Sequence, residues 1–178
     1  MAKVKIASDW LTGCAGCHMS LLDIDERIVQ LTEAVEITSS PITDLKRPHD
    51  VVVGLLEGCV ANTTNLAVAK EMREQCQILV AFGDCACLGG VPTMRNPLNC
   101  EEALRRAYVE SESTVNGVVP DDEELACLLP RVKAVHEVVK VDVNLPGCPP
   151  SADAIFFALS ELLAGRIPVI AGDNLRYD

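Results

Sequence analysis

The amino-acid sequence predicts an α/β fold, doubly wound around a mainly parallel sheet, with helices on both faces. Short apolar runs rich in β-branched residues alternate along the chain with segments of helical periodicity, the order expected of successive βα units. One run, Val51–Leu56 (VVVGLL), is uniformly apolar, as expected of a strand buried on both faces. The 178 residues suit a single domain over 1–178.

Four further segments complete the predicted sheet. Lys3–Ser8 (KVKIAS) alternates polar and apolar residues and is typical of a first strand. The others are Val35–Thr38 (VEIT), Ile78–Phe82 (ILVAF) and Val138–Leu145 (VVKVDVNL). No G-x-G-x-x-G follows the first strand, so the chain lacks a nicotinamide-binding fingerprint.

Helices are expected between these strands. One helix should follow the first strand, because four apolar residues recur there at helical spacing: Leu21, Ile24, Ile28 and Leu31. Asn62 or Thr63 can cap a helix that runs to about Cys76, because either side chain can accept a bond from a free amide at the helix start.

The connection between the fourth and fifth strands is long. Cys100–Glu110 is its best helix candidate, and the acidic run Asp121–Glu124 is expected to be a solvated helix start, where the helix dipole favours negative charge. After the last strand, Ser151 can cap a helix at Ala152–Ala164, which Gly165 ends.

The composition narrows the classes of function. A net charge of −11 with no run of Lys and Arg argues against a nucleic-acid surface, and no stretch reaches the roughly 18 apolar residues of a membrane span.

The first residues carry no secretory signal, so a cytoplasmic location is expected. Nine cysteines in a reducing compartment indicate metal or redox chemistry rather than disulfides. The 49% of apolar residues is high, and we interpret the surplus as a buried subunit interface.

Four cysteines follow predicted strands: Cys14 and Cys17 in CAGC, Cys85 in GDCACLGG and Cys148 in LPGCPP. Because the carboxyl ends of parallel strands meet at one edge of a sheet, these thiols are expected to converge there. Four thiolates without a nearby His suit an iron–sulfur cluster best and zinc second.

The glycines beside these cysteines are expected to make room for such a group. Gly16 should let the CAGC segment curl so that two sulfurs reach one site, and Gly83, Gly89 and Gly90 should allow the backbone to approach closely. The prolines of LPGCPP fix the backbone around Cys148.

The other five cysteines are less informative. Cys59, Cys76, Cys100 and Cys127 lie in apolar or helical contexts and are expected to be small buried hydrophobes. Cys87 lies two residues after Cys85, so that C-A-C offers two candidate ligands between which the residues alone do not decide.

The segments CAGCHMSLLDIDE, LLEGCV, AFGDCACLGG and LPGCPPSAD resemble the small subunit of nickel–iron hydrogenases over nearly the whole chain. CAGCHMSLLD is most similar to the cytoplasmic NAD-reducing, bidirectional members. The resemblance implies one proximal 4Fe-4S cluster on four cysteines: Cys14, Cys17, Cys85 and Cys148. The family pattern of Cys-Ala, two variable residues and Gly-Gly puts Cys87 at a variable position.

The resemblance also implies partners. A large subunit would carry the nickel–iron centre and split dihydrogen, and electrons would pass through this chain to diaphorase subunits that hold FMN and iron–sulfur clusters and reduce NAD. The chain would be the electron-transfer subunit of a hydrogen:NAD⁺ oxidoreductase (hydrogen dehydrogenase), a hetero-oligomer. Its task would be to position the cluster and tune the cluster potential through burial and hydrogen bonds to sulfur.

Two departures from the family pattern stand out. Many small subunits have Glu two residues after the second cysteine, where this chain has Met19. Many also continue into a domain with medial and distal clusters, for which this chain has too few well-placed cysteines. The cluster-bearing subunit of respiratory complex I is a weaker resemblance, since adjacent cysteines are expected there in place of CxxC.

Three residues near the cysteines need separate interpretation. Glu57, at the end of the third predicted strand, either acts near the interface with the partner or bonds nearby backbone amides. His18 is expected to bond its own helix start rather than a cluster sulfur. Trp10 is expected to pack over the site or against a partner.

Two other functions fit the same class of fold. A flavodoxin-like carrier would bind FMN in the crevice beyond the strands, and flavin absorbance after removal of iron would identify it. A zinc-stabilised assembly scaffold would use the four thiolates and would be colourless, without a redox signal.

Overall fold

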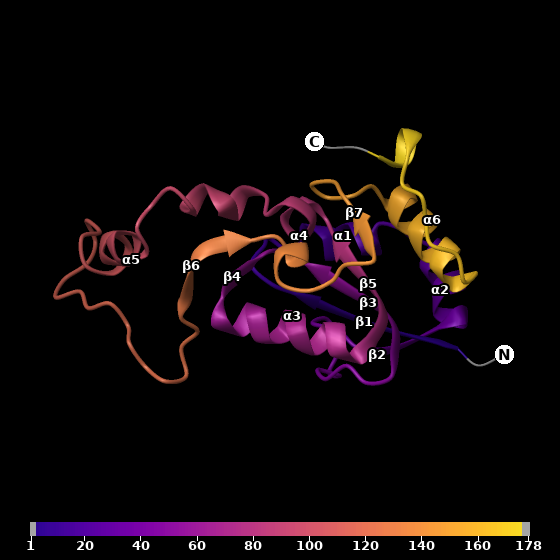
Figure 1. Cartoon of the computed structure of the whole chain (residues 1–178), viewed down its shortest axis with the longest axis horizontal. Helices are drawn as coiled ribbons and strands as arrows, with labels where there is room; N and C mark the ends of the chain where they lie inside the picture. Colours follow the sequence, from indigo (N-terminus) through magenta and orange to yellow (C-terminus); the bar gives the residue numbers. More distant parts are fainter. Residues whose placement is uncertain (1–2, 176–178) are drawn as a thin grey trace.

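The computed structural model, which describes residues 3–175, confirms the α/β class (Figure 1). Five parallel strands form one sheet in the order β2-β1-β3-β5-β7. The strands are β1 (Val4–Trp10), β2 (Val35–Ser39), β3 (Val51–Glu57), β5 (Cys76–Phe82) and β7 (Val143–Leu145).

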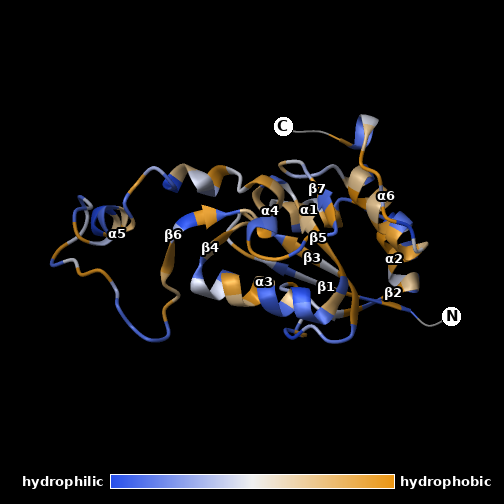
Figure 2. Cartoon of the chain, in the orientation of Figure 1, coloured by the Kyte–Doolittle hydropathy of each residue, from blue (hydrophilic) through white to orange (hydrophobic). Residues whose placement is uncertain are grey.

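Helices cover both faces of this sheet, as predicted. One face carries α1 (Gly16–Leu22), α2 (Arg27–Ala34) and α6 (Ala152–Leu163), and the other carries α3 (Thr63–Gln75) and α4 (Asp84–Leu88). Successive residues of β5 alternate between the two apolar cores, and the strands in Figure 2 are accordingly apolar along most of their length.

The predicted helix caps are confirmed. The Asn62 side chain accepts a hydrogen bond from the backbone N–H of Asn65 (2.8 Å), and the Ser151 hydroxyl accepts one from Ala154 (3.2 Å). Gly165 follows α6 with a φ of 74°, the left-handed conformation that ends many helices.

Three predicted elements differ from the structure. The single helix expected after β1 is divided into α1 and α2, because Asp25 between them has a φ of 58°, which no continuous helix allows. The last strand was expected at Val138–Leu145, but only β7 (Val143–Leu145) pairs in the sheet. The residues before it form a turn that follows the short 3₁₀ helix η2 (Val135–Glu137).

The acidic run Asp121–Glu124 is not a helix start. The Asp122 carboxylate accepts the backbone N–H of Glu124 (2.9 Å), and this local bond holds a turn instead of a helix. The rest of the long connection contains the 3₁₀ helix η1 (Val91–Arg95), which was not predicted, and α5 (Cys100–Tyr108), which lies within the helix predicted at Cys100–Glu110.

A second, two-stranded antiparallel sheet was not predicted. It pairs β4 (Val60–Asn62) with β6 (Leu128–Lys133), both short, and β6 contains a proline. A further 3₁₀ helix, η3 (Gly172–Asn174), follows α6. Among the helices of residues 3–175, none has the length and apolar character needed to cross a membrane.

Candidate metal centre

The last residues of four neighbouring strands lie in one row across the sheet. Trp10 pairs with Glu57, Glu57 with Phe82, and Phe82 with Leu145. The segments that follow three of these strands carry the four predicted ligands: Cys14, Cys17, Cys85 and Cys148. The parallel topology therefore brings cysteines that lie up to 134 positions apart in the sequence to one edge.

Hydrogen bonds join the segments that carry Cys85 and Cys148. The backbone N–H of Asp84 donates to the carbonyl of Gly147 (3.0 Å), and the N–H of Gly147 donates to the Asp84 carboxylate (2.8 Å). Sequence reasoning missed this role of Asp84. Its place directly before Cys85, at the start of a short helix where an acidic side chain is favoured, was the available signal.

Two glycines leave room at the sulfur atoms. A methyl group at Gly83 would overlap the Cys17 sulfur, and one at Gly90 would lie 2.7 Å from the Cys85 sulfur. Both glycines also have positive φ angles, of 87° and 53°. Gly89 was expected to serve the same purpose, but its missing side chain makes room for Thr93 instead.

The bend in the CAGC segment comes from a different residue than predicted. Ala15, not Gly16, has the left-handed conformation, with a φ of 62°, and it precedes the first residue of α1. Gly16 instead makes room for its neighbour, because a methyl group there would lie 3.2 Å from the Cys14 sulfur.

The four thiols lie within one another's electrostatic field. Burial raises the pKa of the Cys17 thiol, and negative charge on Glu57 and on the thiols of Cys85, Cys14 and Cys148 raises it further. Burial also raises the pKa of Cys85, followed by charge on Cys148 and Cys14. Thiolates gathered in this way are stable where a cationic group compensates their charge.

Cys87 points into the core. It is buried, its thiol donates to the carbonyl of Ala81 (3.4 Å), and burial raises its pKa to about 12. Burial raises the pKa of the predicted ligand Cys17 as well, so the surroundings of the two thiols distinguish them. Cys87 turns towards the Ala81 carbonyl, whereas charge on Cys148 and Cys14 acts on Cys85. This geometry favours Cys85 as the candidate ligand, a choice that the residues alone left open.

The remaining cysteines follow the prediction in part. Cys59 and Cys76 are buried, as expected. Cys100 is half-buried, and Cys127 is exposed, contrary to prediction, because the segment before β6 extends away from the core.

Glu57 and His18 form a buried pair directly behind the CAGC segment. The Glu57 carboxylate accepts hydrogen bonds from the backbone N–H groups of Cys17 (3.2 Å) and His18 (2.9 Å) and from the His18 ring at Nδ1. Burial alone would raise the pKa of Glu57, but these bonds and the nearby His18 charge hold that pKa below its ordinary value. Of the two roles considered for Glu57, bonding to backbone amides is the one observed.

Trp10 and Phe82 enclose the His18 ring edge-on, with ring centroids 5.6 and 6.0 Å away. His18 is structural, as expected, but its ring bonds Glu57 and not its own helix start. Trp10 packs on His18 directly behind the CAGC segment. The second ring nitrogen, Nε2, is buried without a hydrogen-bond partner among the described residues.

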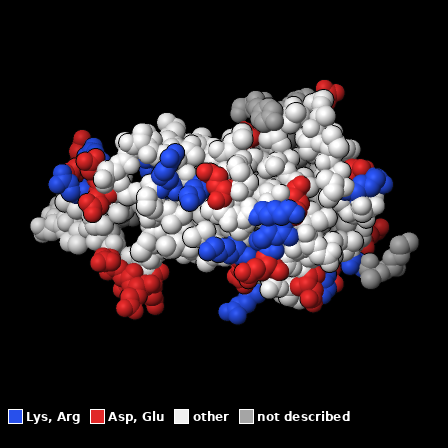
Figure 3. Space-filling view, viewed as in Figure 1, with Lys and Arg blue, Asp and Glu red and all other residues white. Residues whose placement is uncertain are grey.

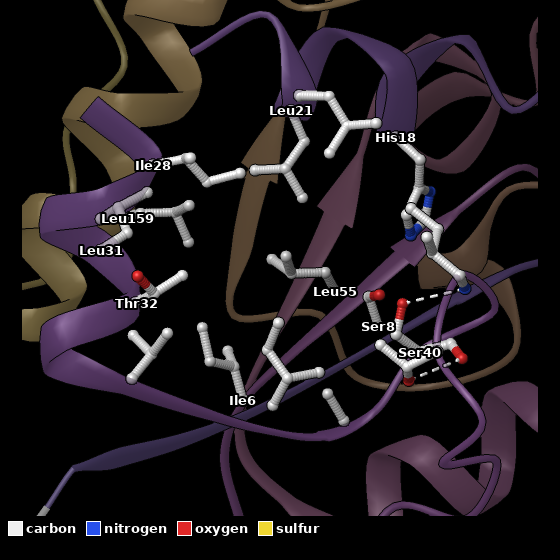
Figure 4. Close-up of a pocket in the computed structure, with 16 residues that line it drawn as sticks. Ile6, Ser8, His18, Leu21, Ile28, Leu31, Thr32, Ser40, Leu55 and Leu159 are labelled. Carbon is white, nitrogen blue, oxygen red and sulfur yellow. Dashed lines mark hydrogen bonds between the residues drawn. The ribbon is translucent and has the colours of Figure 1, made fainter. Parts of the chain in front are cut away.

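His18 also borders an apolar cavity of about 160 Å³ (Figure 4). His18, Ser8 and Ser40 lie at one end, and leucine and isoleucine side chains line the other. The lining includes no cysteine and no Lys or Arg, and the volume is below the roughly 300–1,000 Å³ of most ligand pockets. The cavity is therefore separate from the thiols and poorly suited to a phosphate-bearing flavin.

Within residues 3–175, no three His, Cys, Asp or Glu side chains have the spacing to hold a single metal ion. A tetrahedral zinc with Zn–S bonds of about 2.3 Å would need its four sulfurs about 3.8 Å apart. The candidate donors are four thiols at one edge of the sheet. Glycines lie beside them, so no side chain fills the space next to the sulfur atoms.

Comparisons with known proteins give a consistent assignment. Residues 14–162 match the family model described as NADH ubiquinone oxidoreductase, 20 Kd subunit. The chain is 42% identical over 99% of its length to the delta subunit of the NAD-reducing hydrogenase HoxS of Cupriavidus necator, and it covers 86% of that protein. It is 38% identical over 97% of its length to a subunit of the F420-non-reducing hydrogenase of Methanothermobacter thermautotrophicus, and it spans 58% of that relative.

A solved structure agrees with these sequence matches. A chain of an NAD⁺-reducing [NiFe]-hydrogenase in the H2-reduced state superposes with a TM-score of 0.97 at 43% identity, over 99% of this chain and all of that one. A [NiFeSe]-hydrogenase of Dm. baculatum superposes with a TM-score of 0.61 at 18% identity, which shows a shared fold alone.

Proposed function

The chain belongs to the family of the 20 kDa subunit of NADH ubiquinone oxidoreductase, together with the delta subunit of NAD-reducing hydrogenase, and from that premise we propose that it is the small subunit of a nickel–iron hydrogenase. In this proposal its single domain holds one 4Fe-4S cluster on four cysteines: Cys14, Cys17, Cys85 and Cys148. The chain would carry electrons between the nickel–iron site of a large subunit and an FMN-containing diaphorase module that reduces NAD in the cytoplasm.

One observation carries the proposal: three cysteine-bearing segments leave the same row of strand ends, and charge on the neighbouring thiols contributes to the raised pKa of Cys17 and of Cys85. A bound 4Fe-4S cluster supplies one-electron transfer without proton chemistry. The donor set fits that group, since four thiolates are its usual ligands and the glycines at positions 83 and 90 keep side chains away from two of the sulfurs.

The protein's own residues position the thiols. Glu57 fixes the backbone of Cys17, and Asp84 joins the segments of Cys85 and Cys148. Cys17 is buried, whereas Cys14 and Cys148 are exposed in the isolated chain. The exposed side of the site needs a partner to complete its burial, because burial is one of the determinants of the reduction potential.

Exposed apolar side chains around this edge support a subunit interface there. Trp10, Met19, Leu88, Val91 and Met94 are each 41% to 74% exposed. Apolar residues gathered around one site indicate a protein contact rather than a solvated surface. The large subunit is the partner that would need to lie within electron-transfer reach of the thiols, so we assign this edge to it.

Anaerobic purification, metal and sulfide analysis and EPR of the reduced protein test the proposal. We expect about four irons and four sulfides per chain and a reducible paramagnetic signal. One zinc per chain without sulfide would replace the electron-transfer role with that of a scaffold. Flavin absorbance that persists after iron is removed would indicate an FMN carrier instead.

A further inference from the structure

Helix α5 (Cys100–Tyr108) has an apolar face that the rest of the chain covers only in part. Its apolar residues recur at the spacing of one helix face: Cys100, Ala103, Leu104, Ala107 and Tyr108. Cys100, Ala103 and Leu104 are half-buried, and Ala107 and Tyr108 are exposed. Cys100 contacts the Leu129 carbonyl of β6, but α5 makes no extensive packing contact with another described helix or strand. An amphipathic face in this position lacks the tertiary packing that normally stabilises a helix.

The helix is also short for one that stands alone. Asn99 caps its start by accepting the N–H groups of Glu101 (2.8 Å) and Glu102 (3.4 Å), and Arg105 and Arg106 lie in its last turn. Each of these features favours the helix only modestly. Isolated helices shorter than about 12–15 residues are nevertheless marginal in water, so a helix of nine residues needs a surface to cover its apolar side.

Residues 97–127, here named the α5 arm, extend this unpartnered surface. The chain between α5 and β6 contains no helix or strand, and Val115 and Val118 are 86% and 77% exposed. A groove of about 660 Å³ separates the apolar face of α5 from the returning segment 119–128. Leu104, Tyr108 and Leu125 line this groove together with Cys100 and Cys127.

The charge of the arm indicates what kind of surface covers it. The arm has eight acidic and two basic side chains, a net charge of −6 out of −11 for the whole chain. Glu101, Asp121 and Asp122 line the groove, and Figure 3 shows a cluster of acidic side chains on the underside of the arm. An apolar patch rimmed by Lys and Arg is complementary to this arrangement.

The position of the arm indicates which partner provides that patch. β1 begins near the marked N-terminus on the right of Figure 1, and α5 lies at the left, beyond α4 and α1, the helices that contain Cys85 and Cys17. Exposed apolar residues continue along the chain from Cys85 towards α5: Leu88, Val91, Met94 and Leu98. A partner that covers the cysteine edge is therefore in reach of the arm as well.

We propose that the α5 arm docks on the large subunit, with the apolar face of α5 and its groove covered by an apolar patch that Lys and Arg residues surround. This inference rests on the proposed function, which places the large subunit at the cysteine edge. The arm then adds a second anchor, away from the thiols, to the same interface. The acidic side chains steer the two subunits together, and the apolar face holds them.

The test uses the complete complex, co-expressed and purified anaerobically through a tag on this chain. Leu104→Asp, on the apolar face of α5, is expected to lower the amount of large subunit retained by about tenfold or more, because it places an unpaired charge in the interface. Val29→Asp makes the same change at a 58% exposed site on α2, away from the arm, and should retain the wild-type amount. Iron per chain should equal the wild-type value in both variants.

Hydrogen exchange gives a second readout that needs no variant. The backbone amides of α5 should exchange at least about tenfold more slowly in the complex than in the free chain, since a marginal helix becomes covered. If the arm stays free, the α5 amides exchange at the same rate in the complex and in the free chain. That result would overturn the proposal. Replacing Asp121, Asp122, Glu123 and Glu124 by their amides should slow association and weaken its dependence on salt.

Other outcomes reject the proposal and remain distinguishable from failure of the proposed function. Loss of diaphorase subunits alone in Leu104→Asp would assign the arm to a different partner. A dimer of the free chain that this substitution dissociates would assign it to a second copy. Wild-type protein without iron and sulfide would remove the proposed function itself, whatever the arm binds.

Discussion

The carboxylate of Glu57 and the ring of His18 are in direct contact inside the protein, with 2% and 0% of each residue exposed. A carboxylate only accepts, so Nδ1 of His18 is the donor. Because Glu57 also accepts the N–H groups of Cys17 and His18, the end of β3 holds the start of α1 through three hydrogen bonds. The pair thus fixes the backbone from which a predicted ligand, Cys17, projects.

Removal of this carboxylate should loosen the CAGC segment. Glu57→Ala leaves three donors unpaired in the interior, and breaking a buried pair of this kind costs about 3–5 kcal/mol. We expect Glu57→Ala to lower the free energy of unfolding by that order and to reduce iron per chain, as measured by denaturant unfolding and metal analysis. Glu57→Gln, which keeps the shape and one acceptor oxygen, should lose less of both. Wild-type iron and stability in Glu57→Ala would show that the contact does not hold the segment.

Cys85 and Cys87 should differ sharply when each is replaced by alanine. Cys85 lies among the other thiols, whereas Cys87 points into the core. We expect Cys85→Ala to lose nearly all iron and sulfide. Cys87→Ala should keep both and lose about 1–2 kcal/mol of stability from the small cavity left behind. The reverse pattern of iron retention would assign the ligand to Cys87.

The missing side chain at Gly83 should matter for binding of the cluster and much less for folding of the chain. A methyl group there overlaps the Cys17 sulfur, so Gly83→Ala is expected to reduce iron and sulfide per chain several-fold. Gly165→Ala is the matched control, since Gly165 also has a positive φ, of 74°, but no atom lies within 4 Å of an added methyl group. The control should lose only about 1 kcal/mol through backbone strain and keep its iron. Equal iron in the two variants would contradict a tight fit at the Cys17 sulfur.

The sheet and the convergence of the four cysteines could be predicted because local patterns determine them. Apolar runs such as Val51–Leu56 specify strands, and the topology of parallel strands then gathers their carboxyl ends. The pairing of β4 with β6 could not be predicted, since β4 has only three residues and Pro130 lowers the strand signal of β6. The short α4 and its Asp84 were missed for a similar reason, as five residues carry too little periodicity to indicate a helix.

Within the site, the choice between Cys85 and Cys87 as a ligand could not be predicted from the sequence either. Both follow β5 in an apolar context, and the sequence contains nothing that says which thiol turns towards Cys14 and Cys148. The left-handed conformation of Ala15 is likewise invisible in the sequence, because alanine seldom adopts it and the neighbouring glycine is the expected site. Contacts between segments far apart in the chain decide both features.

Asp142 should make stability depend on acidic pH. Its half-buried carboxylate accepts hydrogen bonds from Arg73 (2.5 Å) and from the backbone N–H of Leu79 (2.9 Å), and Lys140 lies 3.1 Å away. Burial opposes ionisation, but the bonds from Leu79, Arg73 and Lys140 outweigh it and lower the pKa from 3.8 to about 2. A carboxyl with a lowered folded-state pKa stabilises the protein above its unfolded pKa, and the stabilisation is lost as the pH falls through the folded value.

The ionised carboxylate should therefore contribute about 2 kcal/mol at pH 7, and this contribution should decline as the pH falls from about 4 to about 2. Asp142→Asn keeps the shape of the side chain but removes the charge. We expect its urea midpoint to lie below that of the wild type at pH 7 and the difference to shrink to roughly half at pH 3. Acid also releases iron from iron–sulfur proteins, but that loss affects both proteins, so the difference between them isolates residue 142. A difference that stays constant between pH 7 and pH 3 would mean that the Arg73 contact does not lower the pKa of Asp142.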